Sequence, residues 1–269
     1  MTEPLLQRVN GFFEKAGCGT DRAGLAELAS EGAAEAVKAG AVASGLVFGE
    51  ILTPEEVFRL LDLGKDDVFY DLGSGRGQVV LAAALSSMPK RCVGVELMAP
   101  RHQVALAARA CAPEDVQRTC EFRCEDALEC QLEDASKVYV CNAAFPRHLN
   151  AAFSASLSAR RAPALTALVT CAALPEESLR QAGLQLSQVA QCSATWATDG
   201  APLFLYRRCS DVAAASNHAV PKIPHNVLYE ASRQLTAASA ASQHPGLSPE
   251  DERSLLRSAA LASKLAGWS

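Results

Sequence analysis

The sequence predicts an α/β fold, with a seven-stranded, mostly parallel sheet that ends in an antiparallel hairpin. Two observations lead to this fold class. Short apolar runs alternate with helical patterns from residue 53 to residue 183. After them, extended runs at 186–195 and 202–208 are joined by Thr198-Asp199-Gly200, a composition typical of turns between antiparallel strands.

The composition is that of a folded protein with a sizeable core. Apolar residues make up 49% of the 269 residues and charged residues 20%, which excludes global disorder. The 25 basic and 30 acidic side chains give a net charge of −5, which argues against a general nucleic-acid coat. We find no apolar stretch of about 18 residues and no secretory leader, so we expect neither a membrane protein nor a secreted one.

The ten cysteines are scattered and often stand inside apolar runs. They form no Cys-x-x-Cys pair and have no histidine cluster nearby, so no metal site is expected. We interpret them as small buried hydrophobic residues in a reducing compartment.

The N-terminal segment, 1–45, is predicted to be helical. Apolar residues recur at helical spacing in 3–16, and 21–39 is rich in Ala, Glu and Leu. The C-terminal segment, 210–269, is predicted to contain an Ala/Ser-rich linker and helices near 226–242 and 249–266. These segments flank a central domain at 46–209.

The first half of the central domain reads as helix, strand, helix, strand, helix. Thr53 can cap the first helix, Pro54 suits its first position and Gly64 can end it. We expect the following elements to be a strand at 67–72, a helix at 78–87, a strand at 92–96 and a helix at 101–111.

The second half continues the alternation. The expected strands are 120–124, 136–141 and 164–171, and the expected helices are 146–157 and 176–183. In such a sheet, ligands bind at the carboxyl ends of the parallel strands.

The strongest motif is the run Asp71-Leu72-Gly73-Ser74-Gly75-Arg76-Gly77-Gln78 between a strand and a helix. The glycines allow a tight turn and a close approach to a ligand. A pyrophosphate-binding turn would not favour the carboxylate of Asp71, whereas a ligand with an ammonium group would. Glu96 closes the next strand, where a carboxylate can accept both hydroxyls of a ribose. A nucleoside with a cationic amino-acid end fits these features, so we predict S-adenosyl-L-methionine as the cofactor and a class I methyltransferase, Rossmann-like fold.

Other interpretations of this motif rank lower. A P-loop is excluded because no Gly-Lys-Ser/Thr follows. A nicotinamide-dependent dehydrogenase and a purely structural strand–turn–helix stay open as minor alternatives.

Polar residues after the third and fourth strands extend the candidate site. Asp126 could bind the adenine amino group, or it could be a solvated loop acid. Asn142 could position a nitrogen nucleophile, or it could cap the helix at 146–157. Phe145 could form a wall of the nucleophile's channel.

The central domain resembles the disruptor-of-telomeric-silencing family of non-SET histone lysine methyltransferases. The resemblance rests on ordered blocks from about residue 46 to residue 209: Phe48-Gly49-Glu50, DLGSGRGQVV from Asp71, Gly94-Val95-Glu96, VYVCNAAF from Val138, and Ala194-Thr195-Trp196.

The resemblance implies roles for individual residues. Glu50 and Ile51 would close over the methionine part of the cofactor, and Trp196 and Phe145 would line a lysine channel, with Tyr206 in place of a family tyrosine. It implies cofactor contacts from Glu50, Asp71, Gly73, Ser74, Gly75, Gly77, Gln78, Glu96, Asp126 and Asn142, and a catalytic group of Asn142, Phe145, Trp196 and Tyr206. It also implies a protein partner such as a histone or nucleosome, and a nuclear location, while a cytoplasmic location stays open.

The sequence departs from the family pattern at two positions of the fourth-strand motif. Cys141 replaces an asparagine and Ala143 replaces a phenylalanine, and the family's basic flanks are not evident. The main hypothesis is in-line methyl transfer to a neutral lysine amine of a protein. The alternatives are amino-methylation of nucleic acid, because Asn142-Ala-Ala-Phe145 loosely resembles Asn-Pro-Pro-Phe, and an inactive cofactor-binding scaffold. A small-molecule substrate also stays open.

Overall fold

The structure is a computed structural model that describes residues 3–18, 50–86, 89–143, 145, 147–195 and 197–209. Several predictions lie outside these residues: the helix at 21–39, Phe48 and Gly49 of the first family block, Trp196, and the C-terminal segment 210–269.

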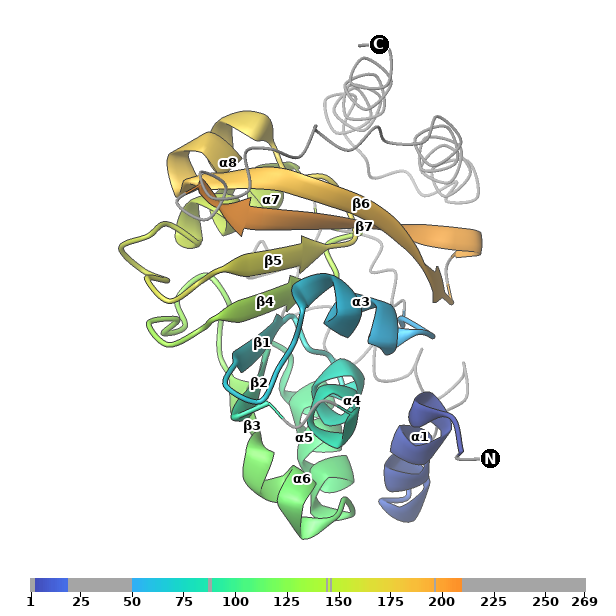
Figure 1. The fold of residues 1–269 in the computed structure, drawn as a ribbon. Helices are drawn as coiled ribbons and strands as arrows, with labels where there is room; N and C mark the ends of the chain where they lie inside the picture. Colours follow the sequence, from blue (N-terminus) through green and yellow to red (C-terminus); the bar gives the residue numbers. More distant parts are fainter. Residues whose placement is uncertain are drawn as a thin grey trace, which may run out of the picture.

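The core of the described chain is one seven-stranded sheet in the order β3-β2-β1-β4-β5-β7-β6 (Figure 1). The first five strands are parallel, and β7 runs antiparallel to both β5 and β6. This is the predicted fold class. The strands are β1 (Val68–Leu72), β2 (Arg91–Glu96), β3 (Cys120–Cys124), β4 (Lys137–Val140), β5 (Ala167–Thr170), β6 (Leu184–Ala194) and β7 (Ala197–Arg208).

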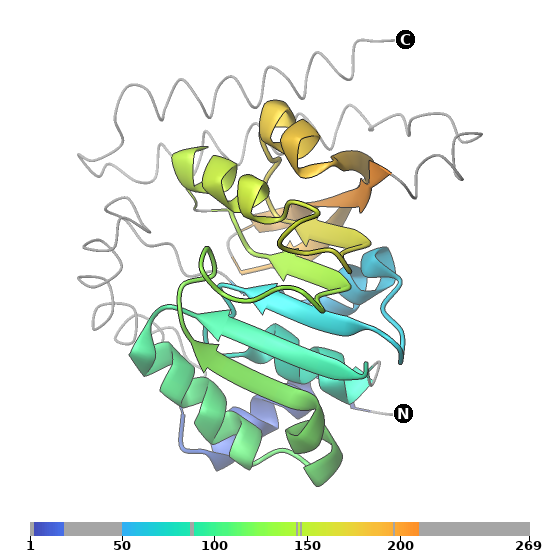
Figure 2. The same cartoon turned by 90° about the vertical axis from the view of Figure 1, so that its left-hand side faces the viewer.

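Helices cover both faces of the sheet (Figures 1 and 2). Buried side chains of α1, α3, α4, α5 and α6 join one apolar cluster, and those of α7 and α8 join the other. Strand β1 feeds both clusters, since Phe69 belongs to the first and Tyr70 to the second. The helices are α1 (Leu5–Lys15), α3 (Pro54–Leu61), α4 (Gln78–Ser86), α5 (Ala99–Ala110), α6 (Glu114–Thr119), α7 (Arg147–Ser156) and α8 (Glu176–Ala182).

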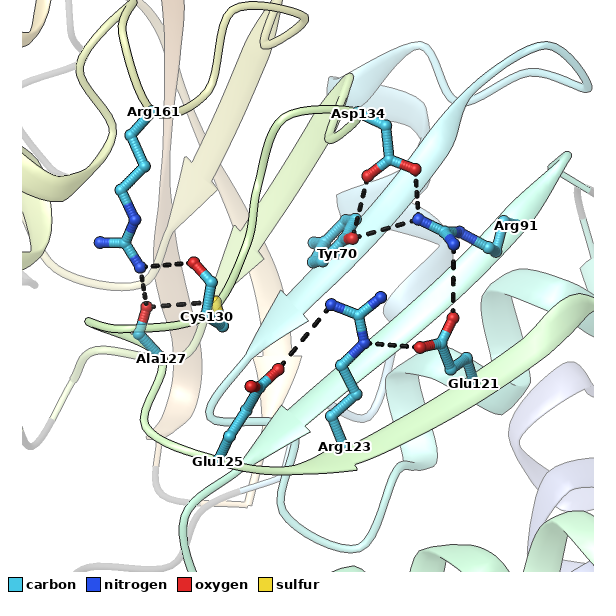
Figure 3. A network of polar contacts seen from close by, with 9 residues as sticks. All are labelled: Tyr70, Arg91, Glu121, Arg123, Glu125, Ala127, Cys130, Asp134 and Arg161. Atoms are coloured by element: carbon cyan, nitrogen blue, oxygen red, sulfur yellow. Dashed lines mark hydrogen bonds and ion pairs between the residues drawn. The ribbon is translucent and has the colours of Figure 1, made fainter.

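A polar network crosses β1, β2 and β3 at the other end of the sheet from the hairpin (Figure 3). Arg91 forms ion pairs with Asp134 and with Glu121. The Tyr70 hydroxyl donates to Asp134 over 3.0 Å, and the Arg123 guanidinium lies 5.7 Å from the Tyr70 ring centre. Burial, helped by the hydrogen bond to Asp134, raises the pKa of Tyr70 to about 12. The hydroxyl therefore stays protonated and can keep donating.

One buried cation fastens the end of β7 to the chain around it. The Arg208 guanidinium donates to the carbonyl oxygens of Leu157, Ala162, Leu165 and Ala182 over 2.6–3.3 Å. Ala182 ends α8, where the helix dipole favours a positive charge. Arg208 therefore joins α8 to the loop between α7 and β5.

The end of α3 differs from the prediction. The sequence pattern places the stop at Gly64, but the helix ends at Leu61 and Asp62 takes the left-handed conformation, with φ of 51°. Asp tolerates this conformation better than most residues other than glycine. Thr53 stands at the cap position, but its hydroxyl accepts the N–H of Ser193 instead of a helix N–H.

The turn of the terminal hairpin also differs from the prediction. Ala194 already pairs with Ala197, so residues 198–200 lie within β7 and not in the turn. The register slips between Cys192 and Ala194, and Gly200 has φ of 94°. Turn-like residues also suit a β-bulge, because one type of bulge places a glycine at positive φ, as many turns do. The composition therefore indicated an irregularity but not its type.

One helix was missed. α6 begins after Pro113, carries Glu114 and Asp115 in its first turn and buries Val116. These are ordinary helix-start signals, but six residues are too few to show a helical period.

Candidate functional site

The candidate site lies at the carboxyl ends of β1 and β4, in the middle of the sheet. The chain runs outward from β1 to β2 and β3, then returns to β4 and continues in the opposite direction. The two strands therefore flank the point at which the strand order reverses, where open α/β sheets bind ligands. The Asp71 motif follows β1, and Cys141 and Asn142 follow β4.

The glycine-rich loop after β1 is folded back onto β2. The N–H groups of Gly73 and Ser74 both donate to the Val95 carbonyl, over 2.8 and 2.9 Å. Gly73, Gly75 and Gly77 have φ of 82°, 57° and 84°. Only glycine adopts such angles without strain, so the loop depends on all three.

Gly77 also makes room for an aromatic ring. A Cβ atom at Gly77 would lie 2.5 Å from the ring of Phe122, and one at Gly94 would lie 2.7 Å from the same ring. Phe122 on β3 therefore fills the space that two glycines leave between the loop, β2 and α5.

Asp71 is a buried carboxylate that lacks a full set of partners. Its side chain is 2% exposed, and its Oδ1 atom has no hydrogen-bond partner among the described residues. Burial raises the pKa of Asp71 well above 3.8, and the negative charges of Cys141 and Glu96 raise it further, while Arg101 opposes them. A ligand with an ammonium group would supply the missing partner and favour the charged form.

Glu96, at the end of β2, braces the same loop. Its Oε2 accepts the N–H of Gly75 over 2.7 Å, and its Oε1 accepts the N–H of Met98 over 2.9 Å. Each carboxylate oxygen can accept two hydrogen bonds, so each keeps one position for a ligand hydroxyl. The carboxylate thus holds the loop and can still bind a sugar.

Arg101 is a site residue that the sequence did not reveal. Its guanidinium lies 2.6 Å from the position a Gly75 Cβ would take, which places a cation directly against the glycine-rich loop. Burial lowers the pKa of Arg101, whereas the charges of Glu96 and Glu50 raise it. Arg101 is in the first turn of α5, where the helix dipole disfavours a cation. That unfavourable position was the one signal available in the sequence.

Glu50 lies behind the loop, in an ion pair. The Arg76 guanidinium grips its carboxylate through two hydrogen bonds of 2.5 and 2.9 Å. Arg76 is buried, donates to Gln78 over 2.9 Å and stacks 4.3 Å from the ring centre of Phe13. The Gln78 amide donates to the Ile51 carbonyl over 3.3 Å. Glu50 and Gln78, both predicted to bind the cofactor, thus also fix the loop to the segment that begins at residue 50.

This segment also pairs with the hairpin. The Glu50 N–H donates to the Thr195 hydroxyl and the Thr195 N–H donates to the Glu50 carbonyl, each over 2.9 Å. Ile51 forms a bridge with Ala194. Two family-like blocks far apart in the sequence therefore meet beside the site.

Asn142 has no free position in its side chain. Its Oδ1 accepts the N–H groups of Cys171 and Ala172 over 2.9 and 2.7 Å, and its Nδ2 donates to Asn150 and to the Ala172 carbonyl over 2.8 and 3.1 Å. An amide makes four such bonds at most. Asn142 therefore joins the ends of β4 and β5 to α7, and a contact with substrate would require one of these bonds to open.

Phe145 faces the glycine-rich loop. Its ring lies 3.8 Å from the position that a Gly73 Cβ would take. The Phe145 N–H donates to the Asn142 carbonyl, and the Asn150 amide donates to the Phe145 carbonyl. The Asn142–Asn150 pair thus fixes an aromatic ring beside the loop that follows β1.

The remaining predicted residues lie in different surroundings. Ser74 is buried at the loop, and no described group pairs with its hydroxyl. Asp126 is exposed after β3, where its Oδ1 accepts the Leu128 N–H over 2.8 Å. Tyr206 is 1% exposed in the core beneath α7 and α8, and its hydroxyl accepts the Leu174 N–H over 3.0 Å. That position gives no support to a role for Tyr206 in a substrate channel.

The site fits S-adenosylmethionine on two counts. The Asp71 oxygen lacks a partner where an ammonium group would be held, and Glu96 keeps two acceptor positions for ribose hydroxyls. Among the described residues, no group of three or more His, Cys, Asp or Glu side chains could hold a metal ion. No helix in the described part of the chain is long and apolar enough to cross a membrane.

Comparisons with known proteins agree with this geometry. Residues 31–164 match the family model described as histone methylation protein DOT1. A protein-lysine N-methyltransferase of Saccharolobus islandicus (strain REY15A) is 44% identical over 59 residues, which are 20% of this chain and 37% of that protein. The chain thus spans little more than a third of that relative.

The fold is shared by a solved structure. The B. subtilis m1A22 tRNA methyltransferase TrmK is 12% identical, with a TM-score of 0.50 over 81% of this chain and 98% of that one. An RNA methyltransferase from Salinibacter ruber, solved with S-adenosyl-L-homocysteine, is 20% identical, with a TM-score of 0.46 over 58% of this chain and 89% of that one.

Proposed function

Because residues 31–164 belong to the DOT1 family, within a chain that has the class I fold of S-adenosylmethionine-dependent methyltransferases, we propose that this protein methylates a lysine side chain of another protein. The family, the fold class and the cofactor are those that the sequence predicted. The protein substrate and the roles of individual residues belong to the proposal.

The unpaired carboxylate of Asp71 is the observation that carries the proposal. S-adenosylmethionine would supply a methyl group on a sulfonium, together with an amino-acid end and a ribose. Asp71 would hold the ammonium of that end and Glu96 would hold the ribose hydroxyls. The methyl-bearing part would then face the loop after β4, where Phe145 lies.

The same side of the site would receive the lysine. A free lysine amine has a pKa of about 10.4 and is mostly protonated at neutral pH. Removal of the amine from water beside the apolar ring of Phe145, together with the positive charge of the sulfonium, would favour the neutral amine, which is the nucleophile. Positioning would then account for much of the catalysis, without a dedicated base.

Core histones are the first substrate to test. The matched family model is described as a histone methylation protein, and an acidic protein with a net charge of −5 is suited to a basic partner. A histone substrate would place the protein in the nucleus.

The test is transfer of tritiated methyl from S-adenosylmethionine to core histones, nucleosomes and whole-cell extract, with Asp71→Asn as a control that should bind the cofactor more weakly. We expect methyllysine in a protein, identified by mass spectrometry. Labelled protein that excludes histones would remove the histone part of the proposal. Label in nucleic acid alone, or cofactor binding without any transfer, would overturn the proposal in favour of the two alternatives from the sequence.

A further inference from the structure

Two cysteines face each other at the edge of the site. The register of β4 and β5 pairs Val140 with Thr170, so the next residues, Cys141 and Cys171, stand opposite each other. Neighbouring strands lie about 4.8 Å apart, and a disulfide requires Cα atoms about 4.4–6.8 Å apart. Both residues belong to the apolar cluster on the α3 and α4 side of the sheet. The spacing and the side of the sheet therefore suit a bond between them.

Hydrogen bonds lower the pKa of the Cys141 thiol. Cys171 donates to Cys141, and this is the largest of the effects that lower the pKa of the Cys141 thiol. Burial opposes it, while Tyr139, the Ala143 N–H and the Arg101 charge lower the pKa further. The same hydrogen bond raises the pKa of Cys171, so the first thiol of the pair to ionise is Cys141.

The two thiols differ in access as well. Cys141 is partly exposed, beside Asp71 in the candidate site, whereas Cys171 is 3% exposed and lies 3.3 Å from the Tyr139 hydroxyl. A small reagent that enters the site therefore meets Cys141 first. A thiolate with a second thiol in contact is the arrangement of a peroxide-reactive cysteine and its resolving partner.

We propose that Cys141 is an oxidation site for hydroperoxides and that Cys171 resolves the product as a disulfide across the ends of β4 and β5. The Cys141 sulfur attacks one peroxide oxygen, the O–O bond breaks, and a sulfenic acid forms while the other oxygen leaves as water. The Cys171 sulfur then attacks the sulfenic sulfur and expels a second water. Overall, two thiols are oxidised and one hydrogen peroxide is reduced to two waters.

The disulfide would act on the acceptor side of the site, and this consequence rests on the proposed function. Asn142 directly follows Cys141, and its Oδ1 accepts the Cys171 N–H. A bond between the two sulfurs would strain this hydrogen bond between Asn142 and Cys171. It would also move Phe145, whose N–H donates to the Asn142 carbonyl. Asp71 and Glu96 belong to other strands. Oxidation should therefore lower turnover more than it lowers affinity for S-adenosylmethionine.

The chain contains a matched control pair. Cys92 and Cys120 also stand opposite each other on parallel neighbours, β2 and β3. Both are buried, and burial raises the pKa of each thiol, to about 12 for Cys120. If strand register alone decided reactivity, both pairs would oxidise. If thiolate formation and access decide it, only Cys141 and Cys171 will.

The experiment treats the full native chain with hydrogen peroxide, blocks remaining thiols under denaturing conditions and maps the peptides by mass spectrometry. We expect a Cys141–Cys171 cross-link while Cys92 and Cys120 stay reduced. In Cys171→Ser, a sulfenic acid at Cys141 should be trapped by a dimedone-type probe. In Cys141→Ser, no cross-link should form at Cys171.

Three outcomes would overturn the proposal: a reduced Cys141 while the exposed Cys124 and Cys209 are oxidised, equal oxidation of the control pair, or a cross-link from Cys141 to Cys192 instead. None of these readouts requires methyl transfer, so they stand apart from the test of the proposed function. A cross-link that leaves turnover unchanged in an active enzyme would remove only the regulatory consequence.

Discussion

Replacing Asp71 with Asn should change two properties of the protein in opposite directions. The carboxylate is buried and one of its oxygens has no partner among the described residues, so its charge destabilises the ligand-free fold. The same charge should bind the ammonium of S-adenosylmethionine. The variant should therefore unfold less readily and bind the cofactor more weakly.

The size of each effect follows from the contacts. A hydrogen bond to a charged group contributes about 1.5–3 kcal/mol, and each 1.4 kcal/mol is about tenfold in affinity. The loss of one such bond predicts an affinity about 10- to 150-fold lower. The asparagine keeps a buried polar oxygen but removes the charge, so we expect a gain of about 1 kcal/mol in the free energy of unfolding at neutral pH.

The pH dependence of stability and of cofactor affinity is a second test of the direction of both effects. The folded protein holds the pKa of Asp71 above the unfolded value, so the proton stabilises the fold. The stability of the native sequence relative to Asp71→Asn should fall as the pH rises from about 4 towards the raised pKa. Cofactor affinity should instead rise with pH over the same range, because binding the ammonium requires the carboxylate. In the variant both dependences should disappear.

The assays are urea denaturation and calorimetry, with the exposed Asp66→Asn as the matched charge control. Methylthioadenosine, which lacks the amino-acid end, serves as a control ligand. Its affinity should be unchanged in Asp71→Asn. Lower stability together with unchanged S-adenosylmethionine affinity would refute this role of Asp71.

Five further substitutions test the other predicted roles. Glu96→Gln should weaken binding of methylthioadenosine and S-adenosylmethionine alike in calorimetry; a loss confined to S-adenosylmethionine would contradict ribose binding. Gly77→Ala should lower the free energy of unfolding by more than about 2 kcal/mol, and Phe122→Leu should recover part of that loss in the double variant; no recovery would exclude the ring contact. Arg208→Met should cost about 3 kcal/mol in urea denaturation, because four buried carbonyls lose their donor. Asn142→Ala should cut turnover more than cofactor affinity while lowering the melting temperature, and normal turnover in a stable variant would remove its role.

The sequence was sufficient for the fold class and for placing the Asp71 loop and Glu96 at the ends of neighbouring strands. The run after Asp71 combines a strand, glycines and a helix within a few residues, so spacing alone locates the loop. Glu96 closes the very next strand, so sheet order places it beside that loop. Both predictions depend on local patterns and on the rule that consecutive parallel strands are neighbours.

The parts that the sequence could not give depend on contacts between distant segments. Arg101 reads as an ordinary helix residue until the fold places its guanidinium against Gly75. Asn142 was assigned to substrate or to a helix cap, whereas its amide binds the backbone after β5. Tyr206 was placed in the channel by resemblance, whereas in the structure its side chain is 1% exposed and its hydroxyl accepts the Leu174 N–H.

The predictions for the hairpin and α6 failed for another reason, because the local sequence patterns there are short and ambiguous. Gly200 supports a bulge as readily as a turn, and only the pairing of Ala194 with Ala197 decides between them. α6 has helix-start signals from Pro113 onward, but it is too short to show the helical repeat of apolar residues that would confirm them.

The most direct test of the central claim is a crystal structure of the chain with S-adenosylhomocysteine. We expect the ligand's ammonium within hydrogen-bonding distance of Asp71 Oδ1 and its ribose hydroxyls on the Glu96 carboxylate, with the sulfur turned towards Phe145. A ligand bound elsewhere, or one whose ammonium avoids Asp71, would contradict the account.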